Sequence, residues 1–308
     1  MTESPTRRLA DALTNPYLLL SFAILVWGGN FVVGRLANLD VPPVALSFWR
    51  HLLAAAMVLP AVAGSHRRDW ATVRGRLGAL AAMTFLFVAG NTLVYFSVLH
   101  TSVTNAALIN AGVPVMAAFF SWIILADLIH RWQALGIALS FTGIVIVVTR
   151  ADVGVLLRLE SGWGDLFMLL AIVCWALYMV LLKRTGLRLS PWSLLFVLSL
   201  GGALWLVPAY AVEVAVGQTT SWTLLTAGSL LYVALFSTIV AWACWNSGTL
   251  RLGPNRASSF MCLHPVFGAG LGMIFFQEAF RPFHVVGTVL ILIGVWLVSR
   301  VYARTARA

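Results

Sequence analysis

Ten apolar segments follow one another along the chain, and each has about the 20 residues that an α-helix needs to cross a lipid bilayer. The polar linkers between them are short, so no room remains for a soluble domain. The segments are 16–37, 43–63, 76–99, 103–126, 132–150, 163–183, 191–214, 224–248, 255–276 and 283–301. The sequence therefore predicts an all-α integral membrane protein with ten transmembrane helices.

Composition supports a membrane protein and limits its partners. The chain is 61% hydrophobic and 10% charged, with a mean hydropathy of +0.93, whereas soluble domains carry roughly 25% charged residues. A net charge of +10 would suggest a nucleic-acid partner for a soluble protein. In a membrane protein, basic residues instead gather in cytoplasmic loops. We therefore expect the lipid bilayer as a partner and no nucleic acid.

The positions of the basic residues predict the orientation. If the N-terminus is cytoplasmic, 15 of the 20 Lys and Arg residues lie at cytoplasmic ends, four lie at the other ends, and Arg50 lies within a span. This bias predicts that the terminal segments 1–15 and 302–308 are both cytoplasmic. Arg7 and Arg8 are interpreted as holding the N-terminus inside, because the following segment is long enough to span and no cleavage site follows. The predicted location is the inner membrane of a bacterium.

The sequence is duplicated. Two similar apolar segments carry a proline at equivalent positions, Pro114 and Pro265, which are separated by 151 residues. Because proline removes a backbone donor and clashes with the preceding turn, we expect a kink in each segment. The same offset aligns Asp127 with Glu278, Gly136 with Gly287, and Gly143 with Gly294.

Five spans in each copy have a topological consequence. An odd number of spans inserts the second copy upside down, so residues 16–150 and 163–301 are predicted to form two inverted five-helix repeats. Transporters built in this way bind substrate between the repeats and work by alternating access. The kinked helices indicate where the site lies, because irregular backbone at membrane depth is tolerated only against protein or water. Pro114 and Pro265 are the predicted hinges.

Several short motifs occur in an order typical of one family. They are Trp27-Gly-Gly-Asn-Phe31, Arg50, the Pro114 helix ending at Asp127, Gly164-Asp-Leu followed by Cys174-Trp-Ala-Leu-Tyr178, and Gln277-Glu278. With these motifs the chain resembles the EamA family of the drug/metabolite transporter superfamily over about residues 16–301. Asp127 departs from the usual Glu but keeps the acidic character. Within the superfamily the chain most resembles bacterial aromatic amino-acid exporters of the YddG kind, which implies export of phenylalanine, tyrosine and tryptophan.

The candidate substrate-binding residues are polar or aromatic side chains deep in the spans, near the kinks or on facing helices. Each has an alternative interpretation as a packing residue, since intramembrane Asn often joins helices and a deep Trp often only packs. The candidates are Asn30, Asn91, Tyr95, Asn110, Trp175, Tyr178, Trp242, Trp245, Asn246 and His264.

Arg50 is a further candidate because ionisable groups at membrane depth are costly and usually functional. Its guanidinium suits a substrate carboxylate. Two structural alternatives stay open, a hydrogen bond between helices and a side chain that extends to the interface. The neighbouring His51 is interpreted as structural.

No acidic residue is expected at mid-membrane, because all ten Asp and Glu residues fall in loops or at span ends. A proton-coupled exporter of organic cations is expected to hold a carboxylate there. The absence of such a carboxylate argues for neutral or zwitterionic substrates and for facilitated movement down a gradient. Combined with the exporters that the chain resembles, it implies facilitative export of aromatic and other neutral amino acids. The alternative is a proton-coupled multidrug or metabolite exporter, with histidine as the proton carrier.

Catalytic and metal motifs are not evident in the sequence. Cys174, Cys244 and Cys262 lack metal-ligand spacing, and no nucleophile or phosphate-binding motif occurs. We expect no enzymatic activity, no metal, no cofactor and a monomer. A lipid-handling or structural membrane protein is the alternative from another class.

Overall fold

The computed structural model describes residues 15–63, 67–127, 130–152, 162–187, 189–252, 257 and 260–305. Within these residues, eight helices are long and apolar enough to cross a membrane, and two shorter apolar helices bring the total to ten. The predicted all-α membrane fold is confirmed. Residues 1–14, including Arg7 and Arg8, and residues 306–308 lie outside the described residues, so the termini stay a prediction.

The helices follow the predicted spans closely, with breaks in three of them. The first half contains α2 (Pro16–Ala37), α3 (Pro43–Ala63), the short α4 (Arg67–Gly75), α5 (Leu77–His100), α6 (Val103–Asn110), α7 (Val113–Leu125) and α8 (Arg131–Thr149). The second half contains α10 (Trp163–Thr185), α11 (Pro191–Ala215), α12 (Leu224–Leu231), η1 (Tyr232–Val240), α13 (Ala241–Leu252), η2 (Phe260–Cys262), α15 (Leu263–Phe276) and α16 (Pro282–Thr305).

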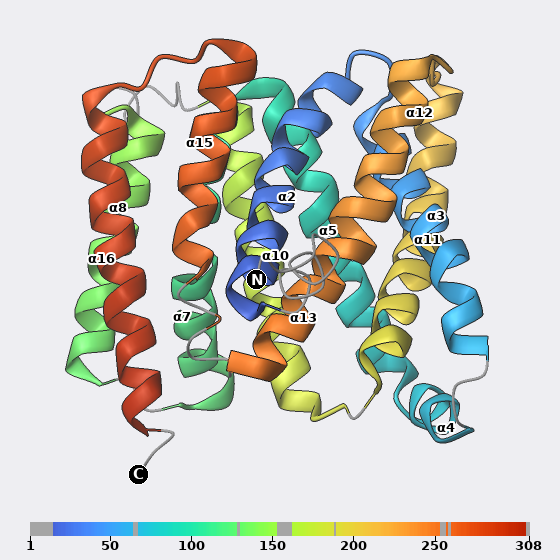
Figure 1. Cartoon of the computed structure of the whole chain (residues 1–308), viewed down its shortest axis with the longest axis horizontal. Coiled ribbons are helices and arrows are strands. Elements are labelled where there is room, and N and C mark those ends of the chain that lie inside the picture. Colours follow the sequence, from blue (N-terminus) through green and yellow to red (C-terminus); the bar gives the residue numbers. More distant parts are fainter. Residues whose placement is uncertain are drawn as a thin grey trace, which may run out of the picture.

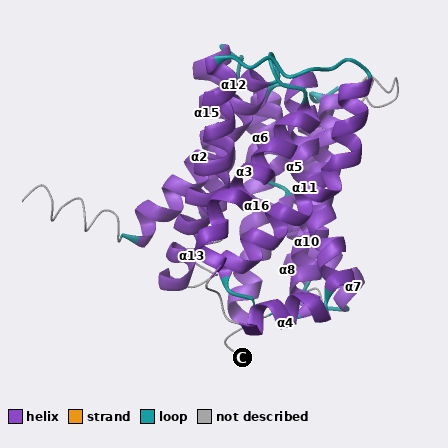
Figure 2. Ribbon diagram, turned by 90° about the vertical axis from the view of Figure 1, so that its right-hand side faces the viewer, coloured by secondary structure: helices purple, strands orange, loops and turns teal. Residues whose placement is uncertain are grey.

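The spans form one bundle with two ends (Figures 1 and 2). We call the end where α2, α5 and α15 finish the Glu278 end, at the top of both figures, and the end where α7 and α10 finish the Asp127 end. Helices α8 and α16 pack together at one edge, and α3 packs on α11 at the other. Between these edges, α2 and α10 occupy the middle of the bundle (Figure 1).

Helices α8 and α16 touch backbone to backbone through four glycines. A Cβ atom on Gly294 would lie 2.4 Å from the carbonyl oxygen of Gly136, and one on Gly143 would lie 2.7 Å from that of Gly287. Since Gly136 is equivalent to Gly287 and Gly143 to Gly294 in the repeat, each contact is the image of the other. Reciprocal contacts of this kind are typical of a two-fold axis. The two halves are thus related as inverted repeats require.

Other helix pairs obey the same relation and interlock the halves. The first span, α2, packs on α15 of the ninth span, and its equivalent α10 packs on α7 of the fourth span. In the same way α2 packs on α13, and α10 packs on α5. Each pair takes one helix from each half, so the region around α2 and α10 is formed jointly by both repeats.

The two apolar segments that carry Pro114 and Pro265 break just before the proline, whereas the sequence predicted a kinked but continuous helix. Helix α6 ends at Asn110, and α7 begins at Val113 with Pro114 in its first turn. In the second copy the 3₁₀ turn η2 precedes α15, whose first turn holds Pro265. Proline is well tolerated in a first turn, where its missing N–H would have no partner. Each span therefore restarts at its proline.

A π-helical segment, η1, lies in the middle of the eighth span, where the sequence predicted one regular helix. Within it, Thr238 Oγ1 donates a hydrogen bond to the carbonyl oxygen of Val233, five residues earlier. π-Helical geometry inside α-helices is rare and is frequently found at functional sites. This one faces α3, as the next section describes.

Candidate substrate-transport site

Arg50 forms the centre of a buried polar cluster. It lies seven residues into α3, about 10 Å from the first residue of that helix at 1.5 Å per residue. Its Nε donates to Thr238 Oγ1 at 2.8 Å, and its Nη1 donates to the Tyr95 hydroxyl at 2.9 Å and to Asn30 Oδ1 at 3.4 Å. The residues come from η1, α5 and α2, so the cluster joins both halves.

The charge of Arg50 is not balanced by its partners. The side chain is 5% exposed, and each hydrogen-bond acceptor found for it among the described residues is neutral. Arg50 thus does not extend to the membrane interface, and its bonds to α2, α5 and η1 are the hydrogen bonds between helices that the other structural alternative predicted. Its substrate role stays a prediction. A buried cation that keeps its charge is costly unless it is paired. This cluster consequently favours an anionic group such as a carboxylate.

The position of η1 next to Arg50 is fixed by contacts with the Trp27–Gly29 stretch of α2. Gly29 leaves room for the Tyr232 hydroxyl, because a Cβ atom at position 29 would lie only 2.4 Å from it. This hydroxyl donates a hydrogen bond to the carbonyl oxygen of Val26 at 2.9 Å. Trp27 Nε1 donates to the carbonyl oxygen of Ser237 at 3.0 Å. These bonds fix η1 against α2 and so place Thr238 in reach of Arg50.

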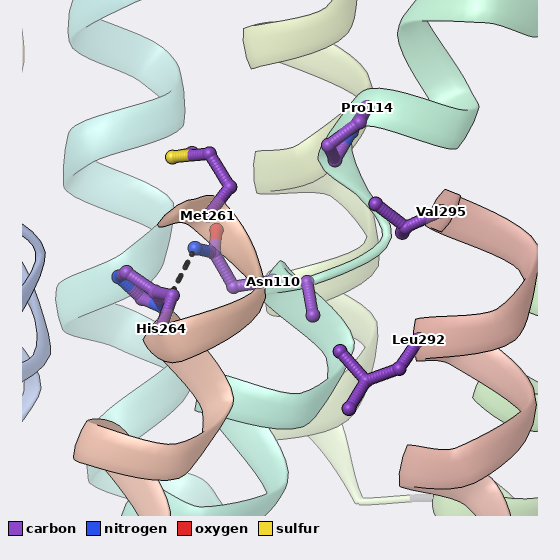
Figure 3. Close-up of a pocket in the computed structure, with 7 residues that line it drawn as sticks. Asn110, Pro114, Met261, His264, Leu292 and Val295 are labelled. Carbon is purple, nitrogen blue, oxygen red and sulfur yellow. Dashed lines mark hydrogen bonds between the residues drawn. The ribbon is translucent and has the colours of Figure 1, made fainter. Parts of the chain in front are cut away.

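The two interrupted spans meet at a small hollow whose cavity volume of about 10 Å³ is about what one water molecule needs. Figure 3 shows Asn110 and His264 facing each other across it, with Asn110 Nδ2 at 3.5 Å from His264 Nδ1. Both are next to the proline breaks, and Pro114 also lines the hollow. The two breaks thus bring these two candidates together around a space of about one water molecule, and the wider opening expected between the repeats stays a prediction.

A third group is aromatic and centres on Phe87 of α5. Its ring lies 5.1 Å from Trp175, 5.6 Å from Tyr178 and 5.4 Å from His51, measured between ring centroids. Trp242 packs against the same cluster. We call these five residues the aromatic layer. The Tyr178 hydroxyl, the Trp242 indole N–H and both His51 ring nitrogens are buried without a hydrogen-bond partner within the described part of the chain.

The remaining candidates lie beside these groups. Asn91 Nδ2 donates to the carbonyl oxygen of Phe87, and Asn246 Nδ2 donates to that of Trp242. Trp245 packs on Trp27 with 5.5 Å between ring centroids. The candidates thus divide into the Arg50 cluster, the Asn110–His264 hollow and the aromatic layer. Their substrate roles, and the hinge roles of the prolines, stay predictions.

Sequence reasoning missed three participants, Thr238, Ser237 and Phe87. Ser237 Oγ donates to Asn30 Oδ1 at 3.3 Å and so belongs to the Arg50 cluster. Two adjacent hydroxyl residues in the apolar run Val233–Val240 were a usable signal for this pair. Phe87 offered no signal, because Phe is a common packing residue in membrane helices.

Carboxylates lie at the ends of the bundle. Glu213 at the end of α11 accepts hydrogen bonds from the Val44 and Ala45 backbone N–H groups at the start of α3. At the Asp127 end, hydrogen bonds from Lys183 and then Ser121 lower the pKa of the Asp127 carboxyl. Across the described residues, no group of three His, Cys, Asp or Glu could hold a metal ion. Asp165 and Glu213 are themselves buried, but they lie in the first or last turn of a span, so the charged group deepest in a span among the described residues is Arg50.

Known proteins of similar sequence identify the family. The sequence matches the EamA-like transporter family over residues 14–149 and 162–300. The chain belongs to this family. It is therefore a multi-pass membrane transporter and not an enzyme. The match includes one segment in each half, in agreement with the duplication.

Individual relatives are distant but match over nearly their whole length. The uncharacterized transporter YyaM of Bacillus subtilis (strain 168) is 28% identical, over 92% of this chain and 93% of that protein. An uncharacterized transporter of Archaeoglobus fulgidus is 23% identical, over 92% and 96%. A probable amino-acid metabolite efflux pump of Escherichia coli (strain K12) is 22% identical, over 91% and 93%. One crystal structure superposes with a TM-score of 0.61 at 16% identity, covering 96% of this chain and 99% of that one, which indicates a shared fold.

Proposed function

We propose that this transporter exports aromatic and other neutral amino acids across the bacterial inner membrane. The observation that carries the proposal is Arg50, a buried guanidinium between the two repeats whose described partners are all neutral. A substrate carboxylate would neutralise it with charge-assisted hydrogen bonds, which are the strongest that a guanidinium makes. One relative named as a probable amino-acid metabolite efflux pump supports this substrate class.

The groups around Arg50 suit the other parts of an amino acid. A carboxylate on Arg50 would release Asn30 Oδ1 and the Tyr95 hydroxyl, which now accept from the guanidinium. The Tyr95 hydroxyl oxygen is then available to the substrate ammonium, which needs acceptors, whereas Asn30 Oδ1 still accepts from Tyr95 and Ser237. The aromatic layer offers ring contacts for an apolar or aromatic side chain. Its unpartnered polar atoms suit a substrate that carries an indole N–H or a hydroxyl.

The proposed transport is facilitative, which means that the amino-acid gradient alone drives it. The carboxylates of the described residues lie in loops, in the short α4 or within the last or first turn of a span, as in Asp165 and Glu213. A zwitterion carries no net charge, so the proposed cycle needs no counter-charge that moves through the protein. Movement down the amino-acid gradient is then sufficient.

Purified protein in liposomes that contain no phenylalanine is expected to take up radiolabelled phenylalanine down its concentration gradient, without an imposed proton gradient. A protonophore should leave the initial uptake rate unchanged, because no proton moves with the substrate. Liposomes without protein are the control. Uptake that requires a proton gradient would instead support the proton-coupled alternative, and uptake of organic cations in place of amino acids would support a multidrug exporter.

Substitution of Asn91, Tyr95, Trp242 or His264 by Ala is expected to lower uptake more than it lowers the yield of folded protein. Tyr95, Trp242 and His264 each belong to one of the three groups, and Asn91 bonds to the backbone of Phe87 in the aromatic layer. Under the proposal, the loss of any of them removes or displaces a contact to substrate. Trp122→Ala is a matched control, since Trp122 is half exposed on the lipid-facing side of α7. Uptake and gel-filtration yield measured together decide between binding and packing, and an equal loss of both favours packing.

A further inference from the structure

Three residues of the aromatic layer, His51, Tyr178 and Trp242, bury polar atoms that have no hydrogen-bond partner within the described part of the chain. The atoms are both ring nitrogens of His51, the Tyr178 hydroxyl and the Trp242 indole N–H. Most buried polar atoms in proteins are paired, and an unpaired one destabilises the fold. Four such atoms in one layer therefore need a physical explanation.

The unpaired atoms belong to side chains that surround one ring. The His51 ring lies 5.4 Å and the Tyr178 ring 5.6 Å from the Phe87 ring, measured between centroids. Trp242 packs in the same hydrophobic cluster as Phe87 and Tyr178. His51 is 0% exposed and Tyr178 is 4% exposed, so bulk water does not reach them in this state. Their partner must therefore be a group that enters the layer.

Both repeats contribute to the layer. His51 and Phe87 belong to α3 and α5 of the first half, whereas Tyr178 and Trp242 belong to α10 and α13 of the second half. A relative movement of the halves, which alternating access requires, would part the unpaired atoms and admit a substrate group between them. His51 also follows Arg50 directly in α3, and neighbouring Cα atoms are about 3.8 Å apart. The layer thus begins next to the proposed carboxylate site.

The unpaired atoms can discriminate between aromatic rings by hydrogen-bond chemistry. An indole N–H only donates, a phenol hydroxyl donates and accepts, and a neutral imidazole has one donor and one acceptor nitrogen. A substrate hydroxyl can therefore accept from Trp242 and donate to His51 or Tyr178. A substrate indole can donate, but it leaves the Trp242 N–H unpaired. A phenyl ring pairs with none of these atoms.

We propose that His51, Tyr178 and Trp242 form a side-chain subsite that selects an aromatic amino acid with a ring hydroxyl, tyrosine, over phenylalanine. The inference rests on the proposed function, because it concerns the side chain of the amino acid whose carboxylate binds Arg50. Without substrate, the three side chains pack around Phe87 with their polar atoms unpaired. With tyrosine bound, the substrate hydroxyl supplies the partner.

Uptake from a mixture of two substrates tests the selectivity. Proteoliposomes are given radiolabelled tyrosine and phenylalanine at equal concentrations well below saturation, so that the ratio of initial rates compares kcat/KM. The parent is expected to favour tyrosine at least about tenfold, as one or two neutral hydrogen bonds predict. 4-Methylphenylalanine adds a group of similar size without a hydroxyl, and it should compete no better than phenylalanine.

Tyr178→Phe removes one hydroxyl and keeps the ring, so it is expected to lower the preference for tyrosine about fivefold. Because that hydroxyl is unpaired in the substrate-free state, the yield of folded protein should not fall. Trp242→Phe removes the indole N–H and is the second variant, with a similar loss of preference. Tyr210→Phe is the matched control, since Tyr210 stacks on Phe48 at 4.7 Å outside the layer and should leave the preference unchanged.

The possible outcomes separate the subsite from the proposed function. Equal uptake of tyrosine and phenylalanine by the parent, or a preference that Tyr178→Phe and Trp242→Phe both leave unchanged, would overturn the subsite alone. A large loss of folded yield in Tyr178→Phe would overturn it as well, because the hydroxyl would then have a structural partner. Uptake of neither amino acid would overturn the proposed function, and the subsite with it.

Discussion

Arg50→Met is expected to lower amino-acid uptake at least about 30-fold, because the loss of a buried charge partner costs about 2–5 kcal/mol or more. The substitution keeps the apolar stem and removes the guanidinium. A substrate carboxylate would then enter a buried site without a cation to neutralise it. Initial uptake rates in liposomes, measured over a range of substrate concentrations, check the expectation.

The fold is expected to tolerate this change. Thr238 still donates to the carbonyl oxygen of Val233, and Asn30 still accepts from Tyr95 and Ser237. Removal of the guanidinium also removes its own desolvation cost, which often offsets the bonds that are lost. The yield of folded protein should therefore stay near that of the parent, so that lost uptake reports on transport.

Two comparisons make the test specific for the carboxylate. Arg50→Lys should recover only part of the uptake, since an ammonium is a point charge without the planar fork of the guanidinium. Competition by tryptamine, which lacks the carboxylate of tryptophan, should be weak in the parent and little changed in Arg50→Met. Normal tryptophan uptake by Arg50→Met, or equal loss of tryptophan and tryptamine binding, would contradict the proposed role.

The transmembrane organisation is the part of the structure that the sequence predicts best. Runs of about 20 apolar residues can only be satisfied as membrane-spanning helices, so the span limits agree with the helices to within a few residues. The offset between Pro114 and Pro265 likewise predicts which residues are equivalent. It does not predict that Gly136 contacts Gly294, because equivalence in a repeat leaves the packing of the two copies undetermined.

The candidate site is predicted less completely. Asn110 and His264 meet because each lies near one of the two equivalent prolines. The 151-residue offset between Pro114 and Pro265 therefore points to this pair from the sequence. Thr238 reaches Arg50 only through the π-helical turn of η1, which the hydropathy of the eighth span does not reveal. The aromatic layer depends on helix rotation within the bundle. Nearly equal apolarity around helices such as α5 leaves that rotation unspecified.

Gly294→Ala is expected to destabilise the folded protein by about 2–3 kcal/mol, near the upper range for overpacking a tight interface. Its new methyl group would lie 2.4 Å from the carbonyl oxygen of Gly136 and 2.7 Å from the Cβ of Ser140. Neither neighbouring atom can move alone, because one is a backbone atom of α8 and the other is a Cβ atom fixed to that backbone. The two helices must separate, and denaturant titration in detergent measures the cost.

Gly270→Ala is the matched control for this substitution. Gly270 also lies in a helix of the second half, but no heavy atom lies within 4 Å of a Cβ added there. The change should be neutral or stabilise the protein by about 0.5–1 kcal/mol, because Ala restricts the unfolded chain more than Gly. A similar loss of stability in both variants would mean that the close approach of α8 and α16 is not the cause.

Double substitutions extend the test to the two-fold relation itself. Gly136 and Gly294 share one contact, so once either Ala has forced the helices apart there, the second should cost less than it does alone. Gly143 and Gly294 belong to the two different contacts, about 10 Å apart at 1.5 Å per residue, and their costs should add more nearly. If the destabilisation of the Gly136/Gly294 double variant equals the sum of its single variants as closely as that of the Gly143/Gly294 double variant, the paired glycine contacts between the repeats would be contradicted. Because Gly143 and Gly294 are equivalent, their single substitutions should also have similar costs, as an approximate two-fold axis requires.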